Sequence, residues 1–233
     1  MYEHIPQRLD EIRARIADAA GRAGRRPSDV RLIAVSKTHP IDAIRAAADA
    51  GQVDFGENKV QEALQKISAA TDTRLRWHLV GHLQSNKAGK AAAACTCIHA
   101  IDSVDLLRRV DQAAEAAGRT IEVLVQVDLA LEVTKHGAPV QDVADIFAAA
   151  DGCRAAALVG LMLLPPIVDD PEQARPWFAR LRTMRDALEA QGVPASRRRE
   201  LSMGMSHDFE VAIEEGATMV RVGTAIFGER HSS

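Results

Sequence analysis

The 233-residue chain is poor in cysteine and aromatic residues and carries little net charge. Its three cysteines, Cys95, Cys97 and Cys153, cannot form an all-paired disulfide framework. Cys95 and Cys97 make a CxC pair, but no cysteine or histidine stands at zinc-ligand spacing from it, so we predict no metal site. With 3% aromatic residues and a formal net charge of -3, the chain lacks the stacking platform and basic surface that nucleic-acid binding requires.

The sequence also lacks long hydrophobic runs. It has no stretch of roughly 18 apolar residues, so no membrane-spanning helix is predicted, and the charged residues 1–15 do not fit a secretory signal. These absences favour a soluble, cytoplasmic protein. A hydrophobic content of 47% suffices for one sizeable core, and no linker or shift in composition divides the chain. We therefore expect a single domain over residues 1–233.

Short apolar runs alternate with stretches of helical periodicity along the whole chain. The first helical stretch places Ile5, Leu9, Ile12 and Ile16 on one face. Eight apolar runs have the character of buried strands, and they cover residues 30–35, 53–55, 76–79, 97–100, 122–127, 158–163, 200–202 and 219–222. Because parallel neighbours need helical crossovers, this alternation predicts a parallel sheet.

Eight parallel strands are the number that closes a barrel, so we predict an α/β fold, a single (β/α)8 TIM barrel. The alternative is an open, doubly wound sheet. Such sheets commonly carry a glycine-rich dinucleotide-binding turn after the first strand. Residues 36–40, which follow the first run here, contain no glycine. The barrel is therefore the favoured architecture.

Lys37 ends the first apolar run. A lysine is rarely buried without a partner, because burial disfavours its charged form. A neutral lysine amine can form a Schiff base with an aldehyde, as in proteins that bind pyridoxal 5'-phosphate (PLP). Taken alone, Lys37 is better explained as a surface lysine at a strand end, and only the rest of the chain changes that interpretation.

Further polar residues fall at the ends of other predicted strands, where barrels place their functional sites. Ser202 and Gly204 follow the seventh run, and Arg221, Gly223 and Thr224 end the eighth. Barrels often hold a phosphate at these two loops, through hydroxyl groups and through glycine N–H groups that a ligand can approach closely. A ligand with both an aldehyde and a phosphate would connect Lys37 to this predicted cup.

Each polar residue also has a purely structural interpretation. Ser206 and Asp208 precede a helical stretch and are predicted to be N-cap residues. His78 and His82 fit hydrogen-bonded side chains near strand ends, and they lack a third metal ligand at a suitable spacing. Glu57 suits either a general base or the favourable start of a helix.

Five blocks of sequence together resemble the YggS/PROSC family of PLP-binding, PLP-homeostasis proteins. They are AVSKT at 34–38, FGENKVQE at 55–62, WHLVGHLQSNK at 77–87, LSMGMS at 201–206 and MVRVGTAIFG at 219–228. The resemblance implies a barrel of the alanine racemase N-terminal domain type, the fold type III PLP architecture. It also implies PLP as an internal aldimine on Lys37, with Arg221 facing the pyridine nitrogen and Asn58 near the ring or its hydroxyl. The implied phosphate-binding residues are Ser202, Gly223 and Thr224.

The same resemblance implies a role in buffering and delivering PLP inside the cell, without a turnover reaction. PLP-dependent apo-enzymes are the implied recipients, and a monomer is favoured over a dimer. The alternative is a PLP-dependent amino-acid racemase, which needs a second acid/base group opposite the lysine. The only tyrosine is Tyr2, at the N-terminus. His39, His78 and His82 remain candidates for that second group, and we expect no catalytic residue.

Overall fold

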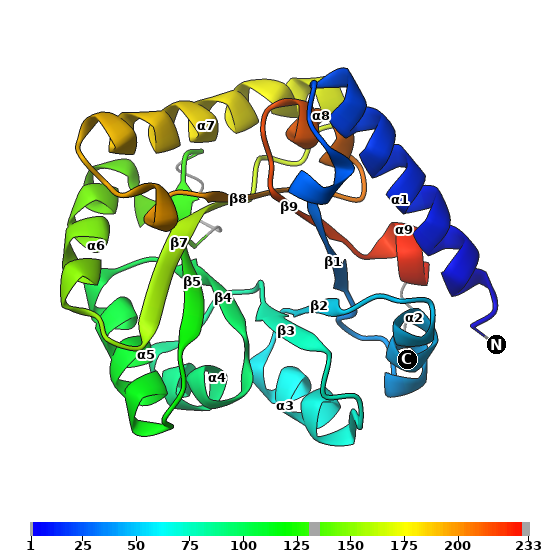
Figure 1. The fold of residues 1–233 in the computed structure, drawn as a ribbon, viewed down its shortest axis with the longest axis horizontal. Coiled ribbons are helices and arrows are strands. Elements are labelled where there is room, and N and C mark those ends of the chain that lie inside the picture. Colours follow the sequence, from blue (N-terminus) through cyan, green and yellow to red (C-terminus); the bar gives the residue numbers. More distant parts are fainter. Residues whose placement is uncertain (1, 131–135, 230–233) are drawn as a thin grey trace.

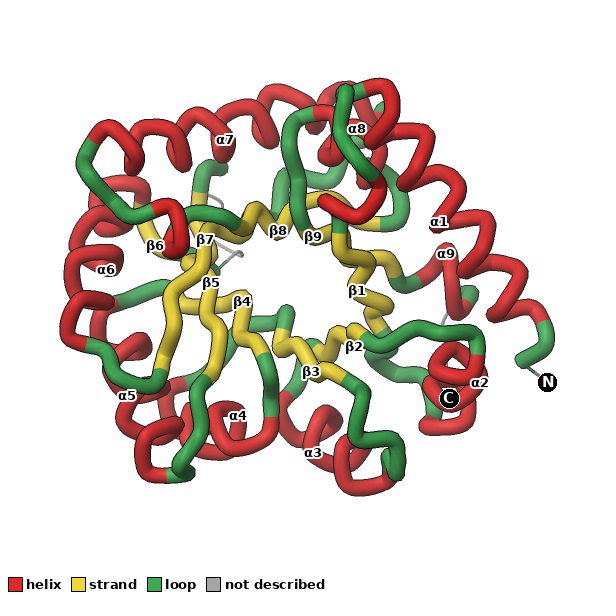
Figure 2. Tube along the Cα trace, viewed as in Figure 1, coloured by secondary structure: helices red, strands yellow, loops and turns green. Residues whose placement is uncertain are grey.

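Eight parallel strands close into a barrel in this computed structural model, which describes residues 2–130 and 136–229. The barrel strands are β1 (Arg31–Val35), β2 (Asp54–Glu57), β3 (Arg76–Leu79), β4 (Cys97–Ile101), β5 (Ile121–Asp128), β7 (Ala156–Leu163), β8 (Glu200–Met205) and β9 (Met219–Val222). They follow the order β4-β3-β2-β1-β9-β8-β7-β5, and β4 pairs with β5 to complete the ring (Figure 2). A two-residue strand, β6 (Ala138–Pro139), pairs with β5 beside the ring.

Helices surround the barrel on its outer side (Figure 1). They are α1 (His4–Arg22), α2 (Ile41–Asp49), α3 (Val60–Ala69), α4 (Ala88–Ala94), α5 (Val104–Ala116), α6 (Val143–Ala149), α7 (Arg175–Ala190), α8 (Phe209–Glu214) and α9 (Thr224–Phe227). Short 3-10 turns cover Pro27–Asp29, Ser85–Lys87, Val140–Asp142, Ala150–Gly152, Pro171–Ala174 and Ala195–Arg197. In the part of the chain that the structure describes, no helix is long and apolar enough to cross a membrane.

The predicted barrel is confirmed, and all eight apolar runs are strands. Two strand boundaries differ from the prediction in a way that matters for the site. Strand β2 continues through Glu57, and β8 continues through Met205, so Ser202 and Gly204 lie inside β8 instead of following it. The reason is that β8 keeps its pairing with β9 as far as Met205 and Arg221, across an irregularity in the register.

The core has two layers, which alternate along the strands. Ala34 belongs to the large apolar layer between barrel and helices, whereas its neighbour Ile33 belongs to a small separate cluster. Successive strand side chains point to opposite faces, so the small cluster fills the inside of the barrel. Its members are Ile33, Cys97, Leu124, Val159, Met162 and Met219. The barrel is therefore packed, and a ligand is restricted to its rim.

Candidate functional site

The carboxyl ends of neighbouring strands bring most of the predicted site residues together. Lys37 follows β1, Asn58 follows β2, and Gly223 with Thr224 follows β9. These three strands are adjacent, because β1 pairs with both β2 and β9. Arg221 lies two residues before Gly223, inside β9, and its side chain is buried. The fold thus places the candidate lysine beside the candidate phosphate loop.

The loop after β9 presents two converging backbone donors. The N–H groups of Gly223 and Ala225 both point to the Ser206 hydroxyl, with N···Oγ distances of 3.2 and 3.4 Å. A Cβ on Gly223 would lie 3.0 Å from the carbonyl oxygen of Val35, so a glycine lets this loop approach the end of β1. Two N–H groups that converge on one oxygen acceptor are the donor arrangement that a phosphate oxygen requires.

The N-cap prediction for Ser206 is wrong, because its hydroxyl accepts hydrogen bonds from the loop after β9. Asp208 does stand at the start of α8, but its side chain makes no capping bond there. It accepts instead from the N–H of Met205, 2.6 Å away. Both side chains therefore stabilise the loop between β8 and α8, on the rim of the barrel. The contact of Ser206 with the loop after β9 is one that sequence reasoning missed.

Ser202, by contrast, lies inside the barrel and is fully buried. Its hydroxyl accepts from Nη1 of Arg221 at 2.6 Å and lies 2.9 Å from Nδ1 of His99. A second Arg221 nitrogen, Nη2, donates to the carbonyl oxygen of Leu163 at 2.8 Å. The Ser202 hydroxyl is thus engaged with Arg221 and His99, and its role as a phosphate ligand stays a prediction.

The hydrogen bonds of Ser202 continue as a chain across the barrel. His99 Nε2 lies 2.9 Å from His78 Nδ1, and His78 Nε2 lies 2.9 Å from Asp54 Oδ1. A guanidinium can only donate and a carboxylate can only accept, which restricts the proton positions between them. With neutral rings, Ser202 donates to His99, His99 to His78, and His78 to Asp54. We call Asp54, His78, His99, Ser202 and Arg221 the interior relay.

Burial is the largest influence on the charged groups of the relay. Burial raises the pKa of Asp54, but hydrogen bonds from His78 and Arg76 outweigh it and hold that pKa below its ordinary value. Burial, with smaller contributions from His78 and Arg221, holds the pKa of His99 far below its ordinary value, so its ring is neutral. Burial also lowers the pKa of Arg221 to about 10, which leaves the guanidinium protonated at neutral pH.

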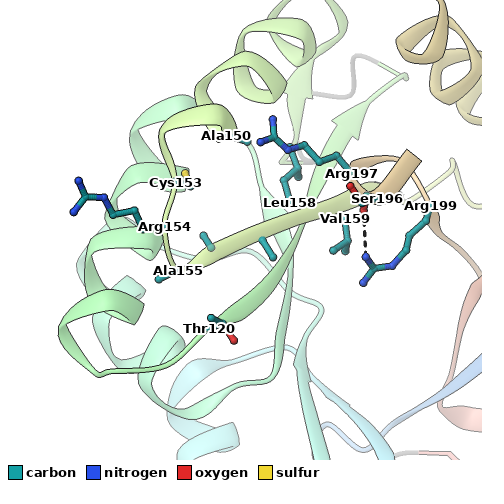
Figure 3. A pocket seen from close by; sticks show the side chains of 12 residues that line it. Thr120, Ala150, Cys153, Arg154, Ala155, Leu158, Val159, Ser196, Arg197 and Arg199 are labelled. Carbon is teal, nitrogen blue, oxygen red and sulfur yellow. Dashed lines mark hydrogen bonds between the residues drawn. The ribbon is translucent and has the colours of Figure 1, made fainter. Parts of the chain in front are cut away.

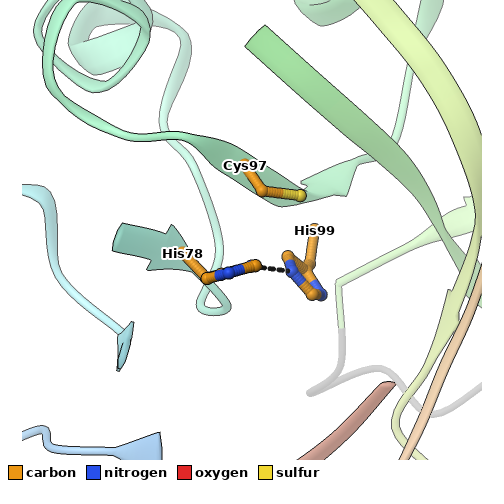
Figure 4. Close-up of side chains that lie close together, drawn as sticks. All are labelled: His78, Cys97 and His99. Carbon is orange, nitrogen blue, oxygen red and sulfur yellow. Dashed lines mark hydrogen bonds between the residues drawn. The ribbon is translucent and has the colours of Figure 1, made fainter. Parts of the chain in front are cut away.

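His78, Cys97 and His99 lie together in the interior, with one ligand atom from each within 4.8 Å of the others (Figure 4). Strands β3 and β4 create this cluster through their pairing, so sequence spacing alone did not reveal it. The facing histidine nitrogens share a hydrogen bond, and burial raises the pKa of the Cys97 thiol well above its ordinary value. The ring nitrogens of the two histidines are therefore occupied by the relay, and the expectation of no metal site stays a prediction.

Glu57 proves to be a buried strand residue and does not open a helix. Its Oε1 accepts from the Ser36 hydroxyl at 2.6 Å and from Lys66 Nζ at 2.7 Å. Its other oxygen, Oε2, is buried without a hydrogen-bond partner among the described residues. Burial raises the pKa of Glu57, against the effect of its two donors. Lys66 could have been identified from the sequence, because it lies at helical spacing from Val60 and Ala63, on the same buried face of α3.

The other two candidate histidines lie nearer the rim. The His39 ring lies 5.1 Å from the ring of Phe227. His82 stacks on His136 with ring centroids 3.6 Å apart, and its Nδ1 lies 3.8 Å from Asp102. Burial and the neighbouring His136 lower the pKa of His82. His78, in contrast, has both ring nitrogens engaged in the relay.

A separate cavity of about 290 Å³ lies at the opposite end of the barrel, around the start of β7 (Figure 3). Its lining includes Arg154, Arg197 and Arg199. Each of these arginines contacts an acidic partner, which is Glu115, Asp151 and Glu122 respectively. Because each arginine is paired with a carboxylate, we place no anion site in this cavity.

Known proteins resemble this chain over almost its whole length. The family model of the alanine racemase N-terminal domain matches residues 7–231. A pyridoxal phosphate homeostasis protein of Aquifex aeolicus is 40% identical over 224 residues, which cover 96% of this chain and 97% of that protein. The structure of PipY from Synechococcus elongatus without PLP has a TM-score of 0.86 at 40% identity, covering 96% of this chain and 100% of that one. Its structure with PLP bound has a TM-score of 0.80 at 42% identity, covering 91% and 100%.

Proposed function

The chain belongs to the alanine racemase N-terminal domain family and, within it, to the pyridoxal phosphate homeostasis proteins, and from this membership we propose that it holds PLP on Lys37. The YggS/PROSC resemblance of the five sequence blocks is thereby confirmed. One observation carries the proposal: a lysine at the end of β1 lies next to the β9 loop, where two N–H groups converge on one acceptor. That pairing suits a ligand with an aldehyde at one end and a phosphate at the other.

Each site residue has a defined task in this proposal. Lys37 binds the aldehyde carbon as an internal aldimine, and PLP supplies an electron-withdrawing ring when it is bound. Arg221 faces the pyridine nitrogen, and its protonated guanidinium disfavours a second positive charge on that nitrogen. Asn58 lies near the ring. The phosphate is held by Gly223 and Thr224 together with Ser206. Ser202 stays a predicted phosphate ligand, because its buried hydroxyl is engaged with Arg221 and His99.

The proposed role is to store PLP and release it to PLP-dependent apo-enzymes in the cytoplasm, without catalysing a reaction. Racemisation needs an acid/base group on each face of the substrate carbon. Both His78 ring nitrogens are occupied inside the barrel, so His78 does not supply the second group. Unprotonated pyridine is also a weaker electron sink, which favours storage over turnover. The racemase is the second candidate, and His39 and His82 are the residues on which it would depend.

Borohydride reduction tests the proposal directly, because it turns a Schiff base into a stable amine. Wild-type protein loaded with PLP should be yellow, and digestion with mass spectrometry should place the reduced cofactor on Lys37. The Lys37→Ala variant should lose the visible band and keep its thermal unfolding transition. Lys59→Ala and Lys87→Ala are the matched controls and should retain the band. Cofactor trapped on Lys59 or Lys87 would overturn the assignment.

A further inference from the structure

The backbone directly after Lys37 is held in an unfavourable conformation. Thr38 has a φ of +67°. In the part of the chain that the structure describes, it is the only residue other than glycine with a positive φ. A β-branched side chain rarely adopts this left-handed region, because its Cβ crowds the backbone. Such strain persists only where the surroundings enforce it, and it gathers at functional sites. The contacts that enforce it here are therefore informative.

Helix α3 holds the peptide groups on both sides of Lys37. The N–H of Thr38 donates to Oε1 of Glu62 at 2.5 Å. The carbonyl oxygen of Ser36 accepts from Nζ of Lys66 at 2.7 Å. Glu62 and Lys66 are one helical turn apart, and they pair with each other at 2.7 Å. One ion pair on α3 thus holds the peptide groups on either side of Lys37.

Lys66 is itself fixed by the barrel. Its side chain is 9% exposed, and its ammonium group has a third partner, Oε1 of the fully buried Glu57, at 2.7 Å. The Ser36 hydroxyl donates to the same Glu57 oxygen at 2.6 Å. An ammonium group has three N–H donors, and Ser36, Glu57 and Glu62 accept one each. This arrangement leaves the ammonium a single orientation.

A purely structural role would be to anchor α3 to the barrel. That role explains the bond between Lys66 and Glu57, which joins α3 to β2. It does not explain why the same side chains reach two backbone groups that flank Lys37, nor why they hold a threonine at positive φ between them. A lysine that attacks an aldehyde must approach it along a defined direction, and the backbone on either side sets that direction.

We propose that Lys66, held by Glu57 and paired with Glu62, is a positioning residue that fixes the backbone from which the Lys37 side chain leaves. We call these three residues the clamp. The inference rests on the proposed function of Lys37. With the clamp intact, the Lys37 amine stays oriented toward an aldehyde bound at the β9 loop. Without it, the turn at Thr38 relaxes to negative φ, and Lys37 reaches the aldehyde more slowly.

The test measures how fast PLP becomes trapped on Lys37 in Lys66→Met, which keeps a long side chain and removes the ammonium group. We expect a loss of about 10-fold or more in rate, since strain of this kind corresponds to one or more factors of ten. Lys59→Met is the matched control, because Lys59 lies at the start of α3 and lines a surface groove together with Thr38 and Lys66. Its rate should equal that of wild type. An unchanged rate in folded Lys66→Met overturns the inference.

A rescue variant separates positioning from structural support. Glycine adopts positive φ without strain, so Thr38→Gly should keep the turn in place when the clamp is absent. Thr38→Gly in the Lys66→Met background should recover most of the lost rate, whereas loss of the α3 anchor would not be repaired by a change at Thr38. A failure to recover any rate overturns the inference. If Lys66→Met does not fold, Glu62→Ala provides the same comparison, because Glu62 is the partner of Thr38.

A second readout uses the protein without cofactor. The pH profile of Lys37 acetylation by acetic anhydride, read by mass spectrometry, reports the environment of its amine. It should change in Lys66→Met and return toward wild type with Thr38→Gly. Wild-type protein that takes PLP on another lysine would overturn the proposed function. The labelling profile would then still decide on the clamp, because an unchanged profile in Lys66→Met overturns it.

Discussion

The Ser202 hydroxyl accepts a hydrogen bond from the Arg221 guanidinium, with 2.6 Å between Oγ and Nη1. Because Arg221 only donates, the hydroxyl proton of Ser202 is directed to its other partner, His99. The same reasoning passes through His78 to the Asp54 carboxylate. The buried Arg221 guanidinium is thus linked through Ser202, His99 and His78 to a buried carboxylate near the other end of the barrel. This link, with the bond from Arg221 to the Leu163 carbonyl, fixes the orientation of the guanidinium.

The interior relay predicts a pH dependence of stability. In the folded protein the pKa of His99 lies far below its ordinary value of 6.5, so only the unfolded chain binds a proton there as the pH falls below 6.5. The stabilisation from neutral His99 is complete above pH 6.5 and is lost progressively toward the lower pKa of the folded state. One proton corresponds to a slope of about 1.4 kcal/mol per pH unit.

This slope can be measured by denaturant unfolding between about pH 7.5 and 5, a range that spans the ordinary histidine pKa of about 6.5. His99→Gln should reduce the slope by about one proton. His207→Gln, at an exposed histidine, is the control and should leave this contribution in place. If the His99 imidazole in folded wild-type protein titrates near its ordinary pKa by NMR, the relay assignment is wrong.

The phosphate cup gives a prediction that separates two serines. Hydrogen bonds to a charged group contribute about 1.5–3 kcal/mol, so losing one should weaken PLP binding by about one to two decades. We expect this loss for Ser206→Ala and for Thr224→Ala, as measured by equilibrium dialysis. Ser202→Ala should weaken PLP binding too if Ser202 contacts the phosphate. If Ser202→Ala changes only the stability of the protein, Ser202 acts in the relay and does not contact the phosphate. If the Ser206/Thr224 double variant binds PLP with unchanged affinity, the phosphate lies elsewhere.

Gly204 supports a prediction about the shape of the rim. Its φ is +93°, and a Cβ at this position would lie 2.6 Å from the Cβ of Ala212. Gly204→Ala should therefore destabilise the protein by more than about 1 kcal/mol, through both backbone strain and overpacking. Gly89 is the matched control, because it lies in α4 with open space around it. Gly89→Ala should stabilise by about 0.5–1 kcal/mol in chemical denaturation. Equal effects of the two substitutions would contradict this account.

The barrel could be predicted because parallel strands are buried on both faces and appear as continuous apolar runs. The same reasoning located Lys37, Asn58 and Gly223, since a residue that follows a strand lies at its carboxyl end. The position of Ser202 could not be predicted in this way. Its inward orientation depends on where β8 ends, and that end is set by pairing with β9 across a register irregularity. The four-residue helix α9 is too short to show a period.

The relay and the clamp could not be predicted from the spacing of residues in the sequence, for a different reason. His78 and His99 are 21 residues apart and meet only through the alignment of β3 with β4. No local pattern encodes such a distance. Lys66 did leave a signal, because a lysine on the buried face of a helix must find acceptors. Its acceptors, Glu57 and the Ser36 carbonyl, lie at the ends of β2 and β1. They could be identified only in the folded structure.

The final prediction concerns catalysis. A PLP racemase needs an acid/base group on each face of the substrate carbon, and each such group contributes about 10²–10⁴-fold. Lys37 would supply one face. The His78 nitrogens are occupied by His99 and Asp54, so the second face depends on His39 or His82. The Arg221 guanidinium should lower activity further, because it disfavours protonation of the pyridine nitrogen.

We therefore expect PLP-loaded protein to show no sustained exchange of the α-hydrogen of L-alanine with deuterated solvent, as followed by NMR. His39→Ala and His82→Ala should leave this background unchanged, and an authentic alanine racemase provides the positive control. Turnover that continues over many cycles and disappears in His39→Ala or His82→Ala would establish a second base. That result would favour the racemase over the storage role, because it would identify the second acid/base group, opposite Lys37, that racemisation requires.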